Sequence, residues 1–210
     1  MFRRFFGGSN GDETPPAPEH AWDLRPGDFL KFGLVAPDGL GRAELQVAGV
    51  HAVDLGGPGK IRRVLELNAP ALDGLRLWRG EDETVAVAHE VDRPVVEKLF
   101  DLDVFALLFD PDEPAAIVLE RLEEPGDLGG WTSGLYRQEG AQQAYHHRED
   151  PATDLIGGQL TGAGEEFDHY RLVSDDRRHA IEVAVYDGGR TEVSLIALLP
   201  EALIEELWSG

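Results

Sequence analysis

The sequence contains no cysteine in its 210 residues. That absence excludes disulfide bonds, thiolate catalysis, iron–sulfur clusters and cysteine-based zinc sites. Lysine is scarce, with three residues, and no stripe of lysine and arginine offsets the net charge of −21. A chain this acidic is repelled at long range by the phosphates of DNA and RNA. We therefore exclude nucleic acid as the main partner.

Long apolar runs are also missing from the chain. No segment approaches the roughly 18 apolar residues of a membrane-spanning helix. Residues 1–8, MFRRFFGG, contain too short an apolar stretch for the core of a secretory signal. We expect no membrane span and a cytoplasmic location. The three phenylalanines of residues 1–8 leave a third interpretation open, peripheral contact with a membrane surface or docking on a partner.

Glycine and proline, with 25 and 13 residues, interrupt the chain at short intervals and favour many short strands. Ile181, Val183 and Val185 alternate with Glu182 and Ala184, as in an antiparallel strand with one buried face. Strands and helices do not alternate regularly, which argues against a doubly wound sheet. The sequence therefore predicts a mainly β fold of the α+β class, built from antiparallel meanders.

Two helices are expected within this β-rich chain. Residues 93–109 carry apolar side chains at helical spacing, and Pro94 suits a first helical turn. Residues 200–210 begin with a proline and predict a short C-terminal helix. The segment EEPGDLGG at 123–130 predicts a boundary between two packed β-rich halves. The expected organisation is a flexible tail at 1–20, a first half at 21–125 with the helix near 93–109, and a second half at 126–210 with the C-terminal meander and helix.

The segment AYHHRED places two adjacent histidines beside two carboxylates. Side chains alternate in direction along a strand, so His146 and His147 are expected to point to opposite faces. A divalent metal held by His147, Glu149 and His169 is one hypothesis, and it requires a strand pairing that the sequence does not prove. The other interpretation is a strand that ends in a polar loop, with solvated imidazoles and no cofactor.

No other motif indicates catalysis. GGPGK at 56–60 has neither the first glycine nor the following serine or threonine of a phosphate-binding loop. GWTSG at 130–134 has its serine one place late for a nucleophile elbow. These absences favour a non-enzymatic protein without deciding the question.

The aromatic residues offer a candidate surface for a protein partner. One predicted hairpin carries Trp131, Tyr136, Arg137 and Tyr145. Tyrosine, tryptophan and arginine are enriched in protein interfaces. The alternative is that the aromatic side chains pack in the core and stabilise strands. The sequence leaves the oligomeric state open.

Three segments together carry a resemblance to a known group of proteins. They are DLRPGDFLKFG near the start, WTSGLYRQ with AYHHRED in the middle, and FDHYRLVSDDRRHAIEVAVYDGG. In this order they resemble uncharacterised bacterial β-rich proteins of a domain-of-unknown-function family. The genes of that family often lie beside envelope-stress or polyamine-related genes. The resemblance implies a small bacterial β protein with an accessory role, and it supplies no catalytic residues.

The leading hypothesis is a non-enzymatic accessory protein that acts through protein–protein contact. The first alternative is a metal-binding protein or metal-dependent enzyme centred on His146 and His147 with His169. The second alternative is a peripheral membrane-associated stress protein that uses residues 1–8.

Overall fold

The computed structural model describes residues 18–56, 60–70, 72–110, 117–155, 160 and 162–210. Within them the protein is mainly β, as the sequence predicts, with eleven strands in one antiparallel sheet and few helices. The strands are β1 (Phe29–Phe32), β2 (Glu44–Asp54), β3 (Ile61–Ala69), β4 (Leu72–Arg79), β5 (Thr84–Val91), β6 (Val118–Glu120), β7 (Leu135–His147), β8 (Glu165–Ser174), β9 (His179–Tyr186), β10 (Thr191–Pro200) and β11 (Ile204–Trp208).

The helices are short. They are the α-helices α1 (Arg93–Leu99), α2 (Leu102–Ala106) and α3 (Pro151–Asp154), and the 3-10 turns η1 (Ala21–Asp23), η2 (Leu107–Phe109), η3 (Gly126–Leu128), η4 (Asp187–Gly189) and η5 (Glu201–Leu203). None of the helices in the described residues is both long and apolar enough to cross a membrane.

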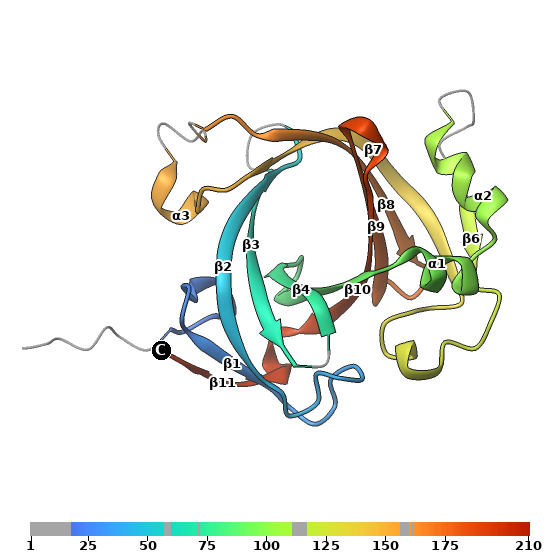
Figure 1. The fold of residues 1–210 in the computed structure, drawn as a ribbon. Helices are drawn as coiled ribbons and strands as arrows, with labels where there is room; N and C mark the ends of the chain where they lie inside the picture. Colours follow the sequence, from blue (N-terminus) through green and yellow to red (C-terminus); the bar gives the residue numbers. More distant parts are fainter. Residues whose placement is uncertain (1–17, 57–59, 71, 111–116, 156–159, 161) are drawn as a thin grey trace, which may run out of the picture.

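Eight of the strands form a closed ring. Their order is β2, β3, β4, β5, β10, β9, β8, β7, and β7 then pairs with β2 through Ala52 and His147, Val53 and His146, and Asp54 and Tyr145. Figure 1 looks into this ring, with β2 and β3 on one side and β8 and β9 on the other. A closed sheet leaves no free edges and gives every ring strand an inner and an outer face.

The two long strands β2 and β7 each pair with a ring strand and with an outer strand along one edge. β2 pairs with β1 near Leu45 and with β7 near Val53, on the same edge. β7 similarly pairs with β6 at one end and with β2 at the other. A register shift between Val47 and Gly49 interrupts the pairing of β2 with β3. Such a bulge bends a strand and turns later side chains to the other face, so β2 can follow the curve of the ring.

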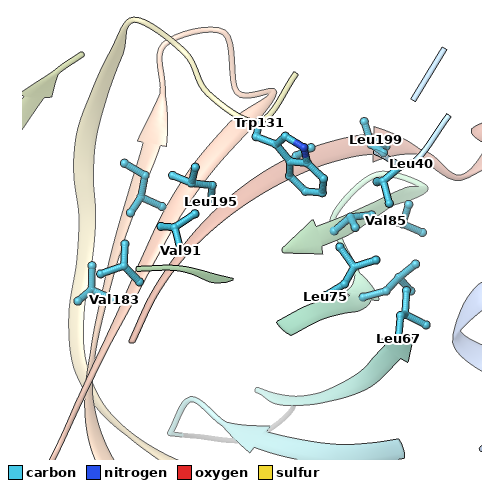
Figure 2. Packing of buried hydrophobic residues seen from close by; sticks show 14 of the residues in the cluster. Leu40, Leu67, Leu75, Val85, Val91, Trp131, Val183, Leu195 and Leu199 are labelled. Atoms are coloured by element: carbon cyan, nitrogen blue, oxygen red, sulfur yellow. The ribbon is translucent and has the colours of Figure 1, made fainter. Parts of the chain in front are cut away.

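The main hydrophobic core lies on the outer face of the ring. Along β10, Val193, Leu195 and Leu199 belong to this core, while Ser194 and Ile196 between them do not. The core is completed by segments outside the ring, including β1, Leu40, α1, α2 and Trp131. Figure 2 shows Trp131, Leu40 and Leu199 together at one end of this layer. The outer apolar face is therefore covered by the rest of the chain, and the inner face is left for other side chains.

The predicted division into halves differs from the observed pairing. β5 pairs with β10 over eight residue pairs, and β2 pairs with β7, so strands from 21–125 and from 126–210 share one sheet. Of the tail expected at 1–20, residues 1–17 lie outside the described residues. His20, which is described, lies 3.2 Å from Glu201 through its Nδ1 atom.

The two expected helices also differ in detail. The segment 93–109 is helical but broken at Phe100, which is extended and bridges to Arg121. Asp101 then starts α2 by accepting hydrogen bonds from the backbone of Asp103 and Val104. At the C-terminus, η5 is followed by the strand β11 in place of a helix. The reason is tertiary pairing with β1, which places Trp208 opposite Phe29 with the rings stacked at 5.4 Å.

The burial of Trp131 leads to a stability prediction. Its side chain is 0% exposed, and its indole N–H donates to the carbonyl of Asp38 at 3.0 Å. We expect Trp131→Ala to lower the free energy of unfolding by about 3–5 kcal/mol, measured by urea denaturation. Arg137→Ala is the control, because that side chain is more than half exposed, and the change should stay within about 0.5 kcal/mol. Equal effects of the two substitutions would contradict the assignment of Trp131 to the core.

Candidate functional site

The inner face of the ring encloses a polar cavity of about 530 Å³. Side chains from all eight ring strands line it, among them His51 of β2, Arg76 of β4, His146 of β7, Glu182 of β9 and Ser194 of β10. We call this cavity the histidine pocket. Because its walls come from strands on every side of the ring, it is the interior of the closed sheet and not a surface groove.

An ion pair crosses the interior from one side of the ring to the other. Arg62 of β3 donates two hydrogen bonds to Glu182 of β9, at 2.8 and 3.0 Å. The Arg62 guanidinium also lies over the ring of Trp78, 4.4 Å from its centre. Since β3 and β9 are not neighbours in the sheet, the pair spans the interior and forms a wall together with Trp78.

The wall fixes the charge state of Glu182. Burial would raise the pKa of this carboxyl, but the charge of Arg62 and the nearby His169 ring outweigh it and hold the pKa well below its usual value. His169 Nε2 lies 3.3 Å from Oε2 of Glu182. Glu182 is therefore ionised and paired, which suits a structural wall better than a proton donor.

Two histidines meet on the same side of the pocket. The rings of His51 and His146 lie 4.6 Å apart and nearly perpendicular. Burial, followed by His146 and Arg76, lowers the pKa of His51 to about 3, and burial also lowers the pKa of His146. Glu66 lies 3.2 Å from His51, but its side chain is more than half exposed, so solvent screens its charge. Both histidines are neutral at neutral pH.

Arg76 is a cation of the pocket whose hydrogen bonding is incomplete. Its Nη2 atom donates to the hydroxyl of Ser194 at 2.7 Å, and the carboxylates of Glu90 and Glu192 lie at 3.8 and 4.0 Å. Its Nε atom is buried and has no hydrogen-bond partner among the described residues. A buried guanidinium N–H group without an acceptor is unfavourable. The Arg76 side chain as a whole is 26% exposed, so its guanidinium can be reached by a molecule in the pocket.

The rim of the pocket is formed around Tyr186. Arg190 lies 3.8 Å from the centre of the Tyr186 ring and bonds to Glu165 at 2.7 Å. Burial, followed by the charge of Glu192, raises the pKa of Tyr186 to about 12. The phenol is therefore protonated at neutral pH and acts only as a hydrogen-bonding group.

The structure brings together two of the three residues of the predicted metal site, His147 and Glu149, and places His169 in the histidine pocket. His146 lines the histidine pocket and His147 does not, in agreement with the alternation expected along a strand. His147 lies 3.8 Å from Glu149 and packs closely against Gly164, where an added Cβ atom would come within 2.7 Å of the ring. His169 faces Glu182 in the pocket. In the part of the chain that the structure describes, no group of three or more histidine and acidic side chains is arranged to hold a metal ion.

The residues of the predicted partner surface are also dispersed. Trp131 and Tyr136 are fully buried, and the Tyr136 hydroxyl accepts a hydrogen bond from the backbone of Ser133. Their burial removes both aromatic side chains from any contact surface. Arg137 is exposed and paired with Asp175, and Tyr145 is half-buried and donates to Gln143. Only Arg137 and Tyr145 remain accessible to a partner.

Sequence reasoning missed the residues that build the pocket. His51, Arg76 and Glu182 each stand between two apolar neighbours in their strands, and alternation alone does not show which face of a strand is enclosed. One sequence signal could have indicated an enclosed polar face. It is a charged residue within a strand that also carries alanine on the same face, as with Glu182 and Ala184.

The ion pair across the ring supplies a test of the wall. We expect Glu182→Leu to destabilise the protein by about 3–5 kcal/mol, because it leaves the Arg62 charge buried without a partner. The double variant Arg62→Leu with Glu182→Leu should recover most of that loss, since an apolar pair of similar size can replace a buried ion pair. Denaturant unfolding of the two variants measures this. Additive losses in the double variant would mean that the two side chains do not act as a pair.

The pKa of His51 predicts how stability depends on pH. An unfolded histidine takes up a proton below about pH 6.5, whereas His51 in the folded protein does so only near pH 3. Between these values the unfolded state binds more protons, so stability falls as the pH is lowered, by at most about 1.4 kcal/mol per pH unit for one proton. We expect His51→Gln to show a shallower fall between pH 6.5 and 4 than the wild type. Identical slopes would show that His51 titrates normally.

Comparison of the chain with family models, with curated proteins and with solved structures found no match. The resemblance to uncharacterised bacterial β-rich proteins thus stays a prediction from the sequence. Two groups distinguish the interior of the closed sheet, the neutral histidine pair and the incompletely bonded Arg76.

Proposed function

We propose that this protein is a non-enzymatic binding protein that takes a small polar molecule into the histidine pocket. The observation that carries the proposal is the Arg76 guanidinium, which lines the cavity beside Ser194 and whose Nε atom has no acceptor among the described residues. The volume of about 530 Å³ falls within the range of about 300–1,000 Å³ that is usual for small-molecule sites.

The charges of the pocket indicate the kind of molecule. Its lining includes four arginines and five glutamates, a nearly even balance in a chain with a net charge of −21. Several of these charges are already paired, as in Arg62 with Glu182 and Arg190 with Glu165. A molecule with a large net charge would disturb this balance. The pocket suits an uncharged or zwitterionic molecule with an acceptor oxygen for Arg76.

The protonation states favour binding over catalysis. General acid–base catalysis is most efficient when the pKa of the group lies near the working pH. The pKa values of His51 and His146 are lowered, that of Glu182 is lowered and that of Tyr186 is raised. These four groups keep one protonation state at neutral pH and are suited to hold hydrogen bonds.

We propose a small-molecule ligand in place of the protein partner that the sequence predicts. The predicted contact surface keeps only Arg137 and Tyr145 at the surface, which is too little to define an interface. Membrane contact through residues 1–8 concerns residues outside the described part of the chain. A cytoplasmic accessory role, as the sequence predicts, is compatible with a protein that binds a small molecule.

A retention experiment tests the proposal. The dialysed wild-type protein is mixed with an equimolar set of amino acids, sugars, nucleosides and organic acids, and the molecules that co-elute on a desalting column are identified by mass spectrometry. We expect at least one neutral or zwitterionic compound to be retained. Ser194→Phe, which fills the pocket, and Arg76→Met, which removes the free donor, should each reduce retention at least tenfold.

Thr191→Phe is the matched control, because Thr191 lies on the same strand, is exposed and does not line the pocket. It should retain the compound as the wild type does. The proposal fails if the wild type retains no compound, or if Ser194→Phe and Arg76→Met retain it as well as Thr191→Phe.

A further inference from the structure

A second cavity, of about 630 Å³, lies at the opposite end of the ring. It is formed where β3 and β9 begin and where β4 and β10 end. Unlike the histidine pocket it is rich in cations, which are Lys60, Arg62, Arg63, Arg79 and Arg171. Its only carboxylates among the described residues are those of Glu81 and Glu182. We call this cavity the arginine pocket.

Two of the five cations are already neutralised by the fold. Arg62 is paired with Glu182 in the wall. Arg63 bonds to both carboxylate oxygens of Asp150 at 2.7 and 2.8 Å, and also to the backbone carbonyls of Trp22 and Leu24. These bonds engage both terminal nitrogens of Arg62 and all three nitrogens of the Arg63 guanidinium. They hold the entrance in shape and leave three other cations for a ligand.

The three remaining cations are Lys60, Arg79 and Arg171. The structure records no ion pair for any of them among the described residues. Of the two carboxylates that line the pocket, Glu182 is already paired with Arg62. The Nε atom of Arg171 is buried and has no hydrogen-bond partner in the described chain. A buried guanidinium N–H is expected to be bonded. An acidic protein that keeps three unpaired cations in one cavity has a local site for an anion.

The floor of this pocket is apolar. Trp78, Ile196 and Ala180 line it and belong to the smaller of the two hydrophobic clusters. At the rim, Arg79 lies over the ring of Trp22, 4.6 Å from its centre. Stacking of this kind fixes the plane of a guanidinium and leaves its N–H edge free for an oxyanion. The pocket thus combines an apolar base with cationic walls.

We propose that the arginine pocket binds a small organic anion, with a carboxylate or phosphate group held by Lys60, Arg79 and Arg171. The apolar body of the anion rests on Trp78 and Ile196. Guanidinium groups match the geometry of carboxylate and phosphate oxygens and bind them strongly. The site is distinct from the histidine pocket, because Arg171 and Arg79 line only the arginine pocket. The wall of Arg62, Glu182 and Trp78 is shared by both.

Calorimetric titration with three probes of one shape tests this inference. The probes are 2-naphthoate, 2-naphthyl phosphate and the uncharged 2-naphthamide, and inorganic phosphate is added as an anion without an apolar body. We expect at least one of the two naphthyl anions to bind at least tenfold more tightly than the amide and than inorganic phosphate. Which anion binds better identifies the head group. Affinity should fall as salt is raised, because exposed charges such as Lys60 and Arg79 are screened.

Variants assign the binding to this pocket. Arg171→Gln should weaken the tighter anion at least tenfold, and Arg79→Gln, at the exposed rim, should weaken it severalfold without a risk to folding. Arg137→Gln is the control, because Arg137 is an exposed arginine outside both pockets. Ser194→Phe blocks only the histidine pocket and should leave anion binding unchanged, which separates this inference from the proposed function. The inference is overturned if neither anion binds the wild type more tightly than the amide, or if Arg79→Gln binds as the wild type does.

Discussion

The ion pair between Arg62 and Glu182 joins two strands that lie across the closed sheet from each other. Their side chains can meet at 2.8 Å only if both point into the ring and the ring is narrow at that level. Together with Trp78 they line both the histidine pocket and the arginine pocket. The interior is thereby divided into two chambers that open toward opposite ends. The other interior residues line one chamber or the other, according to the side of the wall on which they lie.

The few cations of this strongly acidic chain are unevenly distributed between the two chambers and the rest of the protein. Eight of the nineteen lysine and arginine residues line one chamber or the other. The cations of this chain are therefore concentrated in the ring and at its entrances. Net charge alone informs about solubility and long-range attraction. It led us to expect no nucleic-acid partner, and it does not indicate a local cationic site. An acidic protein can still bind an anion where its few cations converge and its acids lie elsewhere.

The sequence predicted the mainly β, antiparallel character because alternation in segments such as 179–186 is a local property. It could not predict closure, since the pairings of β5 with β10 and of β2 with β7 join residues far apart in the chain. Residues 204–208 show why the predicted C-terminal helix was wrong. Ile204 and Leu207 suit a helix face, but pairing with β1 makes them a strand. Alternation also separates two faces without telling which is concave, so the sequence did not show that Glu182 faces the interior of the ring.

The wall also explains how two chambers of different character can share a boundary. A buried ion pair gives little net stability compared with an apolar pair of similar size, so stability alone does not account for Arg62 and Glu182. Because each neutralises the other, the wall adds no net charge to either chamber. The charge character of the histidine pocket is then determined by neutral histidines and balanced rim charges. That of the arginine pocket is determined by Lys60, Arg79 and Arg171. A wall carrying only one of the two charges would impose that charge on both chambers and remove the difference between them.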